Sequence, residues 1–322
     1  MLSHLKTFYE ITFISTGETR MRLFIIVLLL LGLPVDAFAW GVGVHLDLGI
    51  RLLAAPEQLP LALQALLAAQ PLDFLYGCVA ADITLGKKFT HHLEHCHNWR
   101  IGRKILKQAK QEGPAAEACA YGYLAHLAAD TIAHNYFIPY KLSMTYNTVL
   151  LNHAYWEIRA ETGVKPSTWD TAQQLAKNDN RKLDEMLSRL LSDTIFSFRT
   201  NKQLFNSMML VSRLRRWHKL INSMAKRSKW KFDREEHNEY MQMGLEAIQG
   251  ILGDEQSPYW NADPTGDRAL NAAKLIRKNM NLLWLDGKLR QEDSELILKE
   301  LRNRFKLGIT EPDEILPLLT VA

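Results

Sequence analysis

A run rich in Ala and Leu from Ala115 to Phe137 carries three ionisable side chains four residues apart, His126, Asp130 and His134. The apolar background predicts a buried helix that ends before Pro139, and residues four apart lie on one face of such a helix. Ionisable groups inside a buried helix are costly unless they are paired or bind a metal. Imidazole and carboxylate are ligands that zinc accepts. The run therefore predicts a metal site, with a hydrogen-bonded polar network in the core as the alternative.

The other candidate ligands also lie in the first half of the chain. Eight of the eleven histidines fall between His45 and His153. His153 and Glu157 form a second pair four residues apart, which can present one nitrogen and one oxygen to the same ion. Taken alone this pair is weak, because His and Glu at this spacing arise often by chance.

An isolated acidic residue, Asp82, precedes a cluster of four histidines within residues 91–97. A lone Asp in a loop is usually a cap or a solvated residue, whereas such a histidine cluster is harder to dismiss. We choose His97 from the cluster because it lies 15 residues after Asp82 and begins the sequence His-Asn-Trp. His95 is the alternative.

The N-terminal residues have the three parts of a secretory signal. Arg20 and Arg22 precede the apolar run Phe24–Leu33, and the small residues of Ala37-Phe38-Ala39 follow. The apolar run is shorter than the roughly 20 residues that span a bilayer, and a retained anchor or a buried helix is the alternative. We therefore expect residues 1–39 to be an extension and signal peptide, with Met21 as the true start, and the protein to be secreted or periplasmic.

Cleavage after Ala39 would make Trp40 the first residue of the mature chain. Its free α-amine and its carbonyl can chelate a metal together, and His45 can supply a third donor. Because the uncut precursor lacks this amine, secretion and assembly of the metal site would be coupled.

The periodicity of the mature chain predicts an all-α fold without convincing strand alternation. The expected single domain is residues 40–322, with a metal-site core at 40–160 and a helical C-terminal part at 161–322. Residues 71–90 are expected to be less regular, since Gly77 and Gly86 interrupt them. Helices are expected at residues 44–70 (interrupted at Pro60), 99–111, 115–137, 150–161, 170–192, 203–225, 235–252, 267–285 and 290–305.

Taken together, these residues resemble the zinc-dependent phospholipase C family and its relatives, the fungal single-strand-specific zinc nucleases. The resemblance covers about residues 40–160 and rests on the combination and the order of these residues. The pattern is a Trp at the predicted mature start, a following His, an isolated Asp, a later His, then His-x-x-x-Asp-x-x-x-His and His-x-x-x-Glu. It implies an all-helical fold with up to three zinc ions in a cleft.

The resemblance implies a role for each matching position. Trp40 and His45 would hold one zinc, and Asp130 would bridge to a second. His126 and His97 would hold that second zinc, with Asp82 as a ligand or as the general base. A third zinc would take His134, His153 and Glu157. This sequence departs from the pattern in one place, because Thr131-Ile-Ala separates Asp130 from His134 without the longer segment, often containing proline, of the enzymes in the family. Because of this departure, the number of zinc ions, two or three, stays open.

The implied activity is hydrolysis of a phospholipid head-group ester, which releases diacylglycerol and a phosphorylated head group through zinc-activated water. A secreted zinc-dependent single-strand nuclease is the nearest alternative, and a non-catalytic zinc- or membrane-binding module is the alternative from another class. A phosphohydrolase built on an adjacent His-Asp pair is disfavoured, since the chain contains no His-Asp dipeptide.

A basic stretch from Arg199 to Phe232 contains ten Lys or Arg residues and no Asp or Glu, with Trp217 and Trp230 among them. It suits an anionic membrane surface or a single-stranded nucleic acid, and a solvated helix face is the plain alternative. No protein partner is evident. Three cysteines, Cys78, Cys96 and Cys119, allow one disulfide bond at most or three buried thiols.

Overall fold

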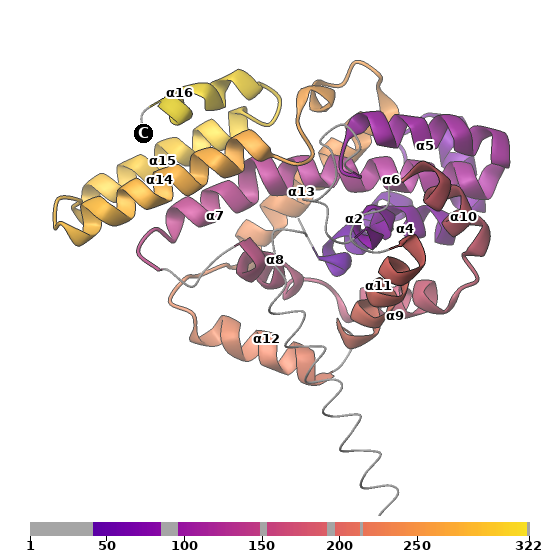
Figure 1. Cartoon of the computed structure of the whole chain (residues 1–322), viewed down its shortest axis with the longest axis horizontal. Coiled ribbons are helices and arrows are strands. Elements are labelled where there is room, and N and C mark those ends of the chain that lie inside the picture. The colour runs from indigo at the N-terminus through magenta and orange to yellow at the C-terminus, as the bar shows by residue number, and fades with distance from the viewer. Residues whose placement is uncertain (1–40, 85–95, 149–152, 192–196, 213–214, 321–322) are drawn as a thin grey trace, which may run out of the picture. The chain divides into compact units, whose positions relative to one another are not determined.

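A computed structural model of the chain describes residues 41–84, 96–148, 153–191, 197–212 and 215–320. Contacts divide the chain into Met1–Ala37 and Phe38–Ala322, and all described residues belong to the second unit. The predicted signal peptide and Trp40 lie outside the described residues. Figure 1 shows the arrangement of the helices.

No strand occurs among the described residues, which confirms the all-α prediction. The elements are α2 (Val42–Ala54), α3 (Leu61–Ala69), α4 (Pro71–Ala80), η1 (Ala81–Ile83), α5 (Trp99–Glu112), α6 (Pro114–Ile132), η4 (Ala133–Phe137), α7 (Ile138–Met144), α8 (His153–Glu161), α9 (Pro166–Lys177), α10 (Arg181–Leu190), α11 (Phe198–Ser212), α12 (Arg215–Arg227), α13 (Arg234–Gly253), η5 (Pro258–Asn261), α14 (Asp267–Leu285), α15 (Gln291–Leu307), η6 (Pro312–Ile315) and α16 (Leu316–Thr320).

Helix α6 is central to the fold, and every residue from Gly122 to Ile132 is buried. It packs against α4, α5 and α13. Contact with α4 is closest at Gly77 and Gly122, where a Cβ on either residue would overlap backbone atoms of the other helix. Glycine is needed at both positions because the two backbones nearly touch.

The prediction of irregular structure at residues 71–90 was wrong for its first half, which forms α4 and η1. Pro71 occupies the first turn of α4, where its missing N–H costs nothing. Gly77 lies inside the helix because α6 approaches there, not because the chain turns. A glycine in the sequence therefore does not tell a close contact between helices from a turn.

The single helix expected at residues 170–192 is two helices, α9 and α10. They separate at Asn178-Asp179-Asn180, where the Asp179 carboxylate accepts the backbone N–H of Arg181 at 3.2 Å. Asn and Asp compete with the helix for its backbone groups in this way. The helix expected at 203–225 corresponds to α11 and α12, with residues 213–214 between them outside the described residues.

The helix that was expected to end before Pro139 continues through that residue into α7. Between α6 and α7 lies one π-helical segment, η4, in which the N–H of Ile138 bonds to the carbonyl of Ala133. Asn135 inserts its side chain here and donates to the carbonyls of Thr131 at 2.9 Å and Asp263 at 2.8 Å. Such a wider turn accommodates an extra residue without ending the helix.

The C-terminal helices α14 and α15 both pack against α7. No single helix among the described residues has the length and apolarity to cross a membrane, although Leu61–Ala69 and Pro71–Ile83, bent by 94° at their junction, pass that test as a pair. Cys78, Cys96 and Cys119 are buried and form no disulfide bond, so the disulfide alternative is not realised in this structure.

Candidate metal centre

Four ligand atoms from three parts of the chain meet beside the buried face of α6. They are Oδ1 of Asp82, Nε2 of His97, Nε2 of His126 and Oδ2 of Asp130, which we call the four-atom group. The nitrogen of His97 lies 3.3 Å from Asp82, 3.0 Å from His126 and 3.1 Å from Asp130. The nitrogen of His126 lies 3.3 Å from Asp130 and 3.8 Å from Asp82.

These separations match the edges of a tetrahedron around zinc. Two ligand atoms, each about 2.0–2.1 Å from a tetrahedral zinc, lie about 3.3 Å apart. All four side chains are buried, with no more than 2% of their surface exposed. A hydrogen-bonded core network, the alternative weighed on the sequence, accounts less well for this geometry. Neither Asp130 oxygen forms a regular hydrogen bond with a described residue, although three ring nitrogens approach it.

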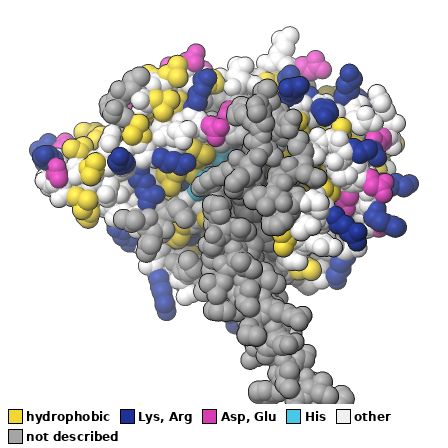
Figure 2. Space-filling model, in the orientation of Figure 1, with side chains coloured by type: hydrophobic (Ala, Val, Ile, Leu, Met, Phe, Trp, Pro, Cys, Tyr) yellow, Lys and Arg dark blue, Asp and Glu magenta, His cyan; other side chains and the backbone are white. Residues whose placement is uncertain are grey.

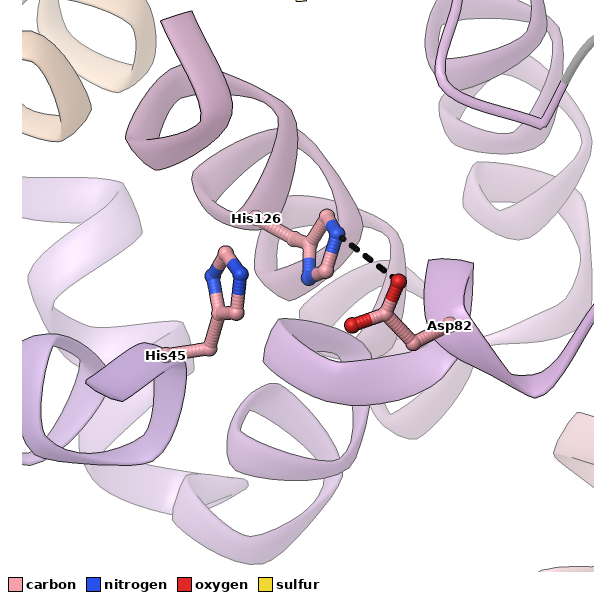
Figure 3. A group of neighbouring side chains, drawn as sticks. All are labelled: His45, Asp82 and His126. Atoms are coloured by element: carbon pink, nitrogen blue, oxygen red, sulfur yellow. Dashed lines mark ion pairs between the residues drawn. The ribbon is translucent and has the colours of Figure 1, made fainter. Parts of the chain in front are cut away.

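A second group shares Asp130 through its other oxygen. Nε2 of His45 lies 3.3 Å from Oδ1 of Asp130, and the His45 ring stacks on the His126 ring with centroids 3.9 Å apart. Figure 3 shows His45, Asp82 and His126 converging from α2, η1 and α6. Asp130 thus lies between two sets of donors, as expected of a bridging carboxylate. Trp40, the other predicted donor, lies outside the described residues.

A third group lies where His134, on η4 directly after α6, meets helix α8. Nε2 of His153 is 2.9 Å from Oε1 of Glu157 on α8, and the rings of His134 and His153 meet edge to face at 5.5 Å. All three residues are at most 8% exposed. His134 lies on the π turn η4, and its contact with His153 places it beside α8.

Two of the histidines are oriented by backbone carbonyls. Nδ1 of His126 lies 2.9 Å from the carbonyl of Cys78, and Nδ1 of His134 lies 2.6 Å from the carbonyl of Pro264. Because a carbonyl only accepts, each Nδ1 must carry the hydrogen, which leaves Nε2 as the free lone pair. Metal-binding histidines are held in this way by a second hydrogen bond.

The site favours the protonation states that bind metal. Burial lowers the pKa of His45 to about 4, and the neighbouring His126 acts in the same direction. Burial likewise lowers the pKa of His134 to about 4. Burial would raise the pKa of Asp130, but His126 and the nearby His45 and His97 outweigh it and hold this pKa well below its usual range. Neutral imidazole and ionised carboxylate are the forms required.

Of the predicted site residues, the structure brings together Asp82, His97, His126, Asp130 and His45, and it places His134 beside His153 and Glu157. Trp40 and the alternative ligand His95 lie outside the described residues. The donors present suit zinc, since they are nitrogen and carboxylate oxygen at tetrahedral spacing.

Sequence reasoning missed two supports of the site. Glu161 lies one turn beyond Glu157, and its Oε1 accepts the backbone N–H of Gly43 at 2.8 Å, which fixes the start of α2 near His45. Burial raises the pKa of Glu161 to about 7. Its four-residue spacing from Glu157 was a usable signal. The loop at 263–266, which packs Gly266 against His134, is 130 residues distant in sequence from its contact and leaves no such signal.

Comparisons with known proteins agree with this geometry. A family model described as zinc dependent phospholipase C matches residues 44–201, a span that contains every candidate ligand except Trp40. A search of curated proteins and a search of solved structures each found no match.

Proposed function

We propose that this chain, which belongs to the zinc-dependent phospholipase C family over residues 44–201, hydrolyses the head-group phosphodiester of a phospholipid. The products would be diacylglycerol and a phosphorylated head group. The observation that carries the proposal is the four-atom group, whose spacing suits one zinc and whose Asp130 faces a second set of donors. Zinc, when bound, polarises a phosphoryl oxygen and lowers the pKa of water toward about 7.

The protein's own residues have separable tasks in this reaction. Asp130 supplies one oxygen to each of two donor sets, and so fixes their spacing. His45 and His126 stack in parallel, which holds both rings in place. Asp82 is the proposed acceptor for the proton of the attacking water, because it is a buried carboxylate within the group.

An Asp82→Asn variant separates the two roles left open for this residue. If Asp82 acts as the base, the variant keeps its zinc and loses activity. If Asp82 is a ligand, zinc and activity fall together. Elemental analysis alongside the turnover of phosphatidylcholine distinguishes the two results, and a variant with wild-type activity would exclude both roles.

His126→Ala tests the proposal as a whole. This side chain contributes to the four-atom group, so bound zinc and activity should both be lost. His237→Ala is the matched control, because His237 is also buried but contacts Phe232 and lies outside the metal groups. Full metal content and activity in His126→Ala would contradict the ligand assignment.

The maturation and location of the protein are part of the proposal. The signal-like residues before Trp40 support export and cleavage after Ala39, which would free the amine of Trp40 to join His45. Mass spectrometry of protein recovered from the periplasm or medium identifies the N-terminal residue directly. A chain that is fully active while it retains residues before Trp40 would contradict this step.

The zinc-dependent nuclease is the second candidate, and the basic stretch favours it. Within that stretch Lys219, Lys226 and Arg227 are exposed on α12, which packs against α8, the helix of His153 and Glu157. A chain that cleaves single-stranded DNA but not phosphatidylcholine would establish the nuclease instead.

A further inference from the structure

The end of the α14–α15 hairpin exposes apolar side chains that the proposed chemistry does not use. Leu282, Leu283, Trp284 and Leu285 are 42–66% exposed at the end of α14, and Leu296 and Ile297 on α15 are 68% and 37% exposed. We call these six residues the apolar collar. In Figure 2, hydrophobic side chains gather among Lys and Arg at the left of the view, where Figure 1 places this hairpin.

The arrangement of the collar around α14 indicates a fluid partner rather than a protein groove. Successive helical residues are about 100° apart, so four consecutive apolar residues cover the whole circumference. A helix that docks in a groove of a protein presents a stripe of residues three and four apart instead. Exposure on all sides suits immersion in lipid, and an indole ring such as that of Trp284 favours the membrane interface.

The depth of the collar also suits the interface. The last four residues of α14 span about 6 Å, and Leu296 lies about 8 Å along α15 from its first residue. Helices that lie in the interface bury their apolar side chains about 5–10 Å deep. The collar is therefore confined to the part of the hairpin that a bilayer surface would cover.

The charges of the hairpin favour a zwitterionic surface. Residues 277–300 contain five basic and five acidic side chains. At the end of the hairpin, Lys288 pairs with Asp286 at 3.2 Å and Arg290 pairs with Asp293 at 2.8 Å. This balance gives no net attraction to anionic lipid, so binding would depend on apolar contact and change little with salt.

The opposite end of α14 lies at the metal centre. Gly266, at its N-terminus, has a left-handed φ of 61° and packs against His134, where a Cβ would overlap the histidine. Helix α14 therefore extends about 28 Å from His134 to the collar. Helix α14 connects the collar to the site across this distance, so the collar can contact a surface without touching the metal-centre residues.

We propose that the apolar collar docks this chain on a zwitterionic phospholipid bilayer. The inference rests on the proposed function, since an enzyme that hydrolyses phospholipids meets its substrate in such a surface. Docking needs no ligand of the metal centre, so it can be measured separately from turnover.

The test compares the full metal-loaded chain with Leu285→Ser/Leu296→Ser, which changes the two most exposed members of the collar. Leu61→Ser is the matched control, because Leu61 is 81% exposed but lies on α3. Flotation with phosphatidylcholine vesicles on ice gives the bound fraction in 0.1 and 0.5 M salt. We expect the double variant to lose roughly a hundredfold in partitioning, the control to match wild type, and salt to change neither.

Turnover provides the second readout. The double variant should hydrolyse a monomeric short-chain phosphatidylcholine as fast as wild type and vesicle lipid more slowly. Unchanged flotation of the double variant would overturn the proposal even if hydrolysis occurs. Binding that is lost in 0.5 M salt would overturn the proposal, because it would mean that the basic helix α12 binds the vesicles instead. A wild-type dimer that the double variant dissociates, seen by light scattering, would show that a second copy covers the collar. Absence of hydrolysis with normal flotation would overturn the proposed function alone.

Discussion

The metal centre and the apolar collar depart from the usual distribution of side chains in opposite directions. In the first, Asp82, His126 and Asp130 are fully buried among apolar residues of α4 and α6. In the second, leucines and a tryptophan face outward at the end of a helical hairpin. Buried ionisable groups need a partner, and exposed apolar clusters need a cover. Both departures therefore indicate ligands, a metal ion in one case and a lipid surface in the other.

The largest effect is expected from removing the charge that the two donor sets share. Asp130→Asn keeps the shape of the side chain but weakens both sets, so activity should fall by at least roughly a thousandfold, with loss of zinc. Asp47→Asn is the control, because Asp47 is also buried but contacts Arg51 and Thr168 instead. Turnover and elemental analysis measure the result. Near-normal activity in Asp130→Asn would remove the basis for a bridged centre.

The two regions should differ as clearly in stability. Leu127→Ala on α6 leaves a cavity in the core beside the metal centre and should cost about 2–5 kcal/mol of unfolding free energy. Leu285→Ala in the collar should cost less than about 0.5 kcal/mol, because the side chain is 66% exposed. Denaturant unfolding compares them. Equal losses would mean that the collar is part of the folded core and not a surface.

Acid should weaken the metal-free protein mainly through the core region. His45 and His134 have folded-state pKa values of about 4, below the unfolded value of 6.5, so the unfolded chain takes up their protons first as the pH falls. Stability is then lost between pH 6.5 and 4, by at most roughly 3 kcal/mol for each histidine.

Glu161 opposes this loss, since its folded pKa of about 7 lies above the unfolded 4.5 and its cost is relieved as the pH falls from 7 to 4.5. The net loss should be roughly 3 kcal/mol at pH 4. Denaturant unfolding of chelator-treated protein at a series of pH values measures it. A metal-free chain that is more stable at pH 4 than at pH 7 would contradict this account of the buried histidines.

The smallest effect is expected at Trp40. Any residue at the mature N-terminus supplies an amine and a carbonyl, so Trp40→Ala should change zinc content and activity little. A substitution at Ala39 that blocks cleavage should be more damaging, because it removes the amine itself. If Trp40→Ala were the worse of the two, the side chain and not the free terminus would matter.

The sequence predicted both helices of the hairpin, at 267–285 and 290–305, but not that their apolar side chains are exposed, whereas in the core it also predicted the candidate ligands. His126 with Asp130, and His153 with Glu157, are visible because helical spacing places them on one face. The π turn that carries His134 could not be predicted, since Asn135 within it reaches the distant carbonyl of Asp263. The sequence of Leu282–Leu285 reads equally well as the buried end of a helix. Only the tertiary packing shows that nothing among the described residues covers it.

The most direct test of the account is the zinc content of the purified mature protein. Elemental analysis should find about two to three zinc ions per chain beginning at Trp40, and fewer in His126→Ala. A metal-free wild-type chain that still hydrolyses phosphatidylcholine would contradict the central claim that the buried histidines and carboxylates form a metal centre.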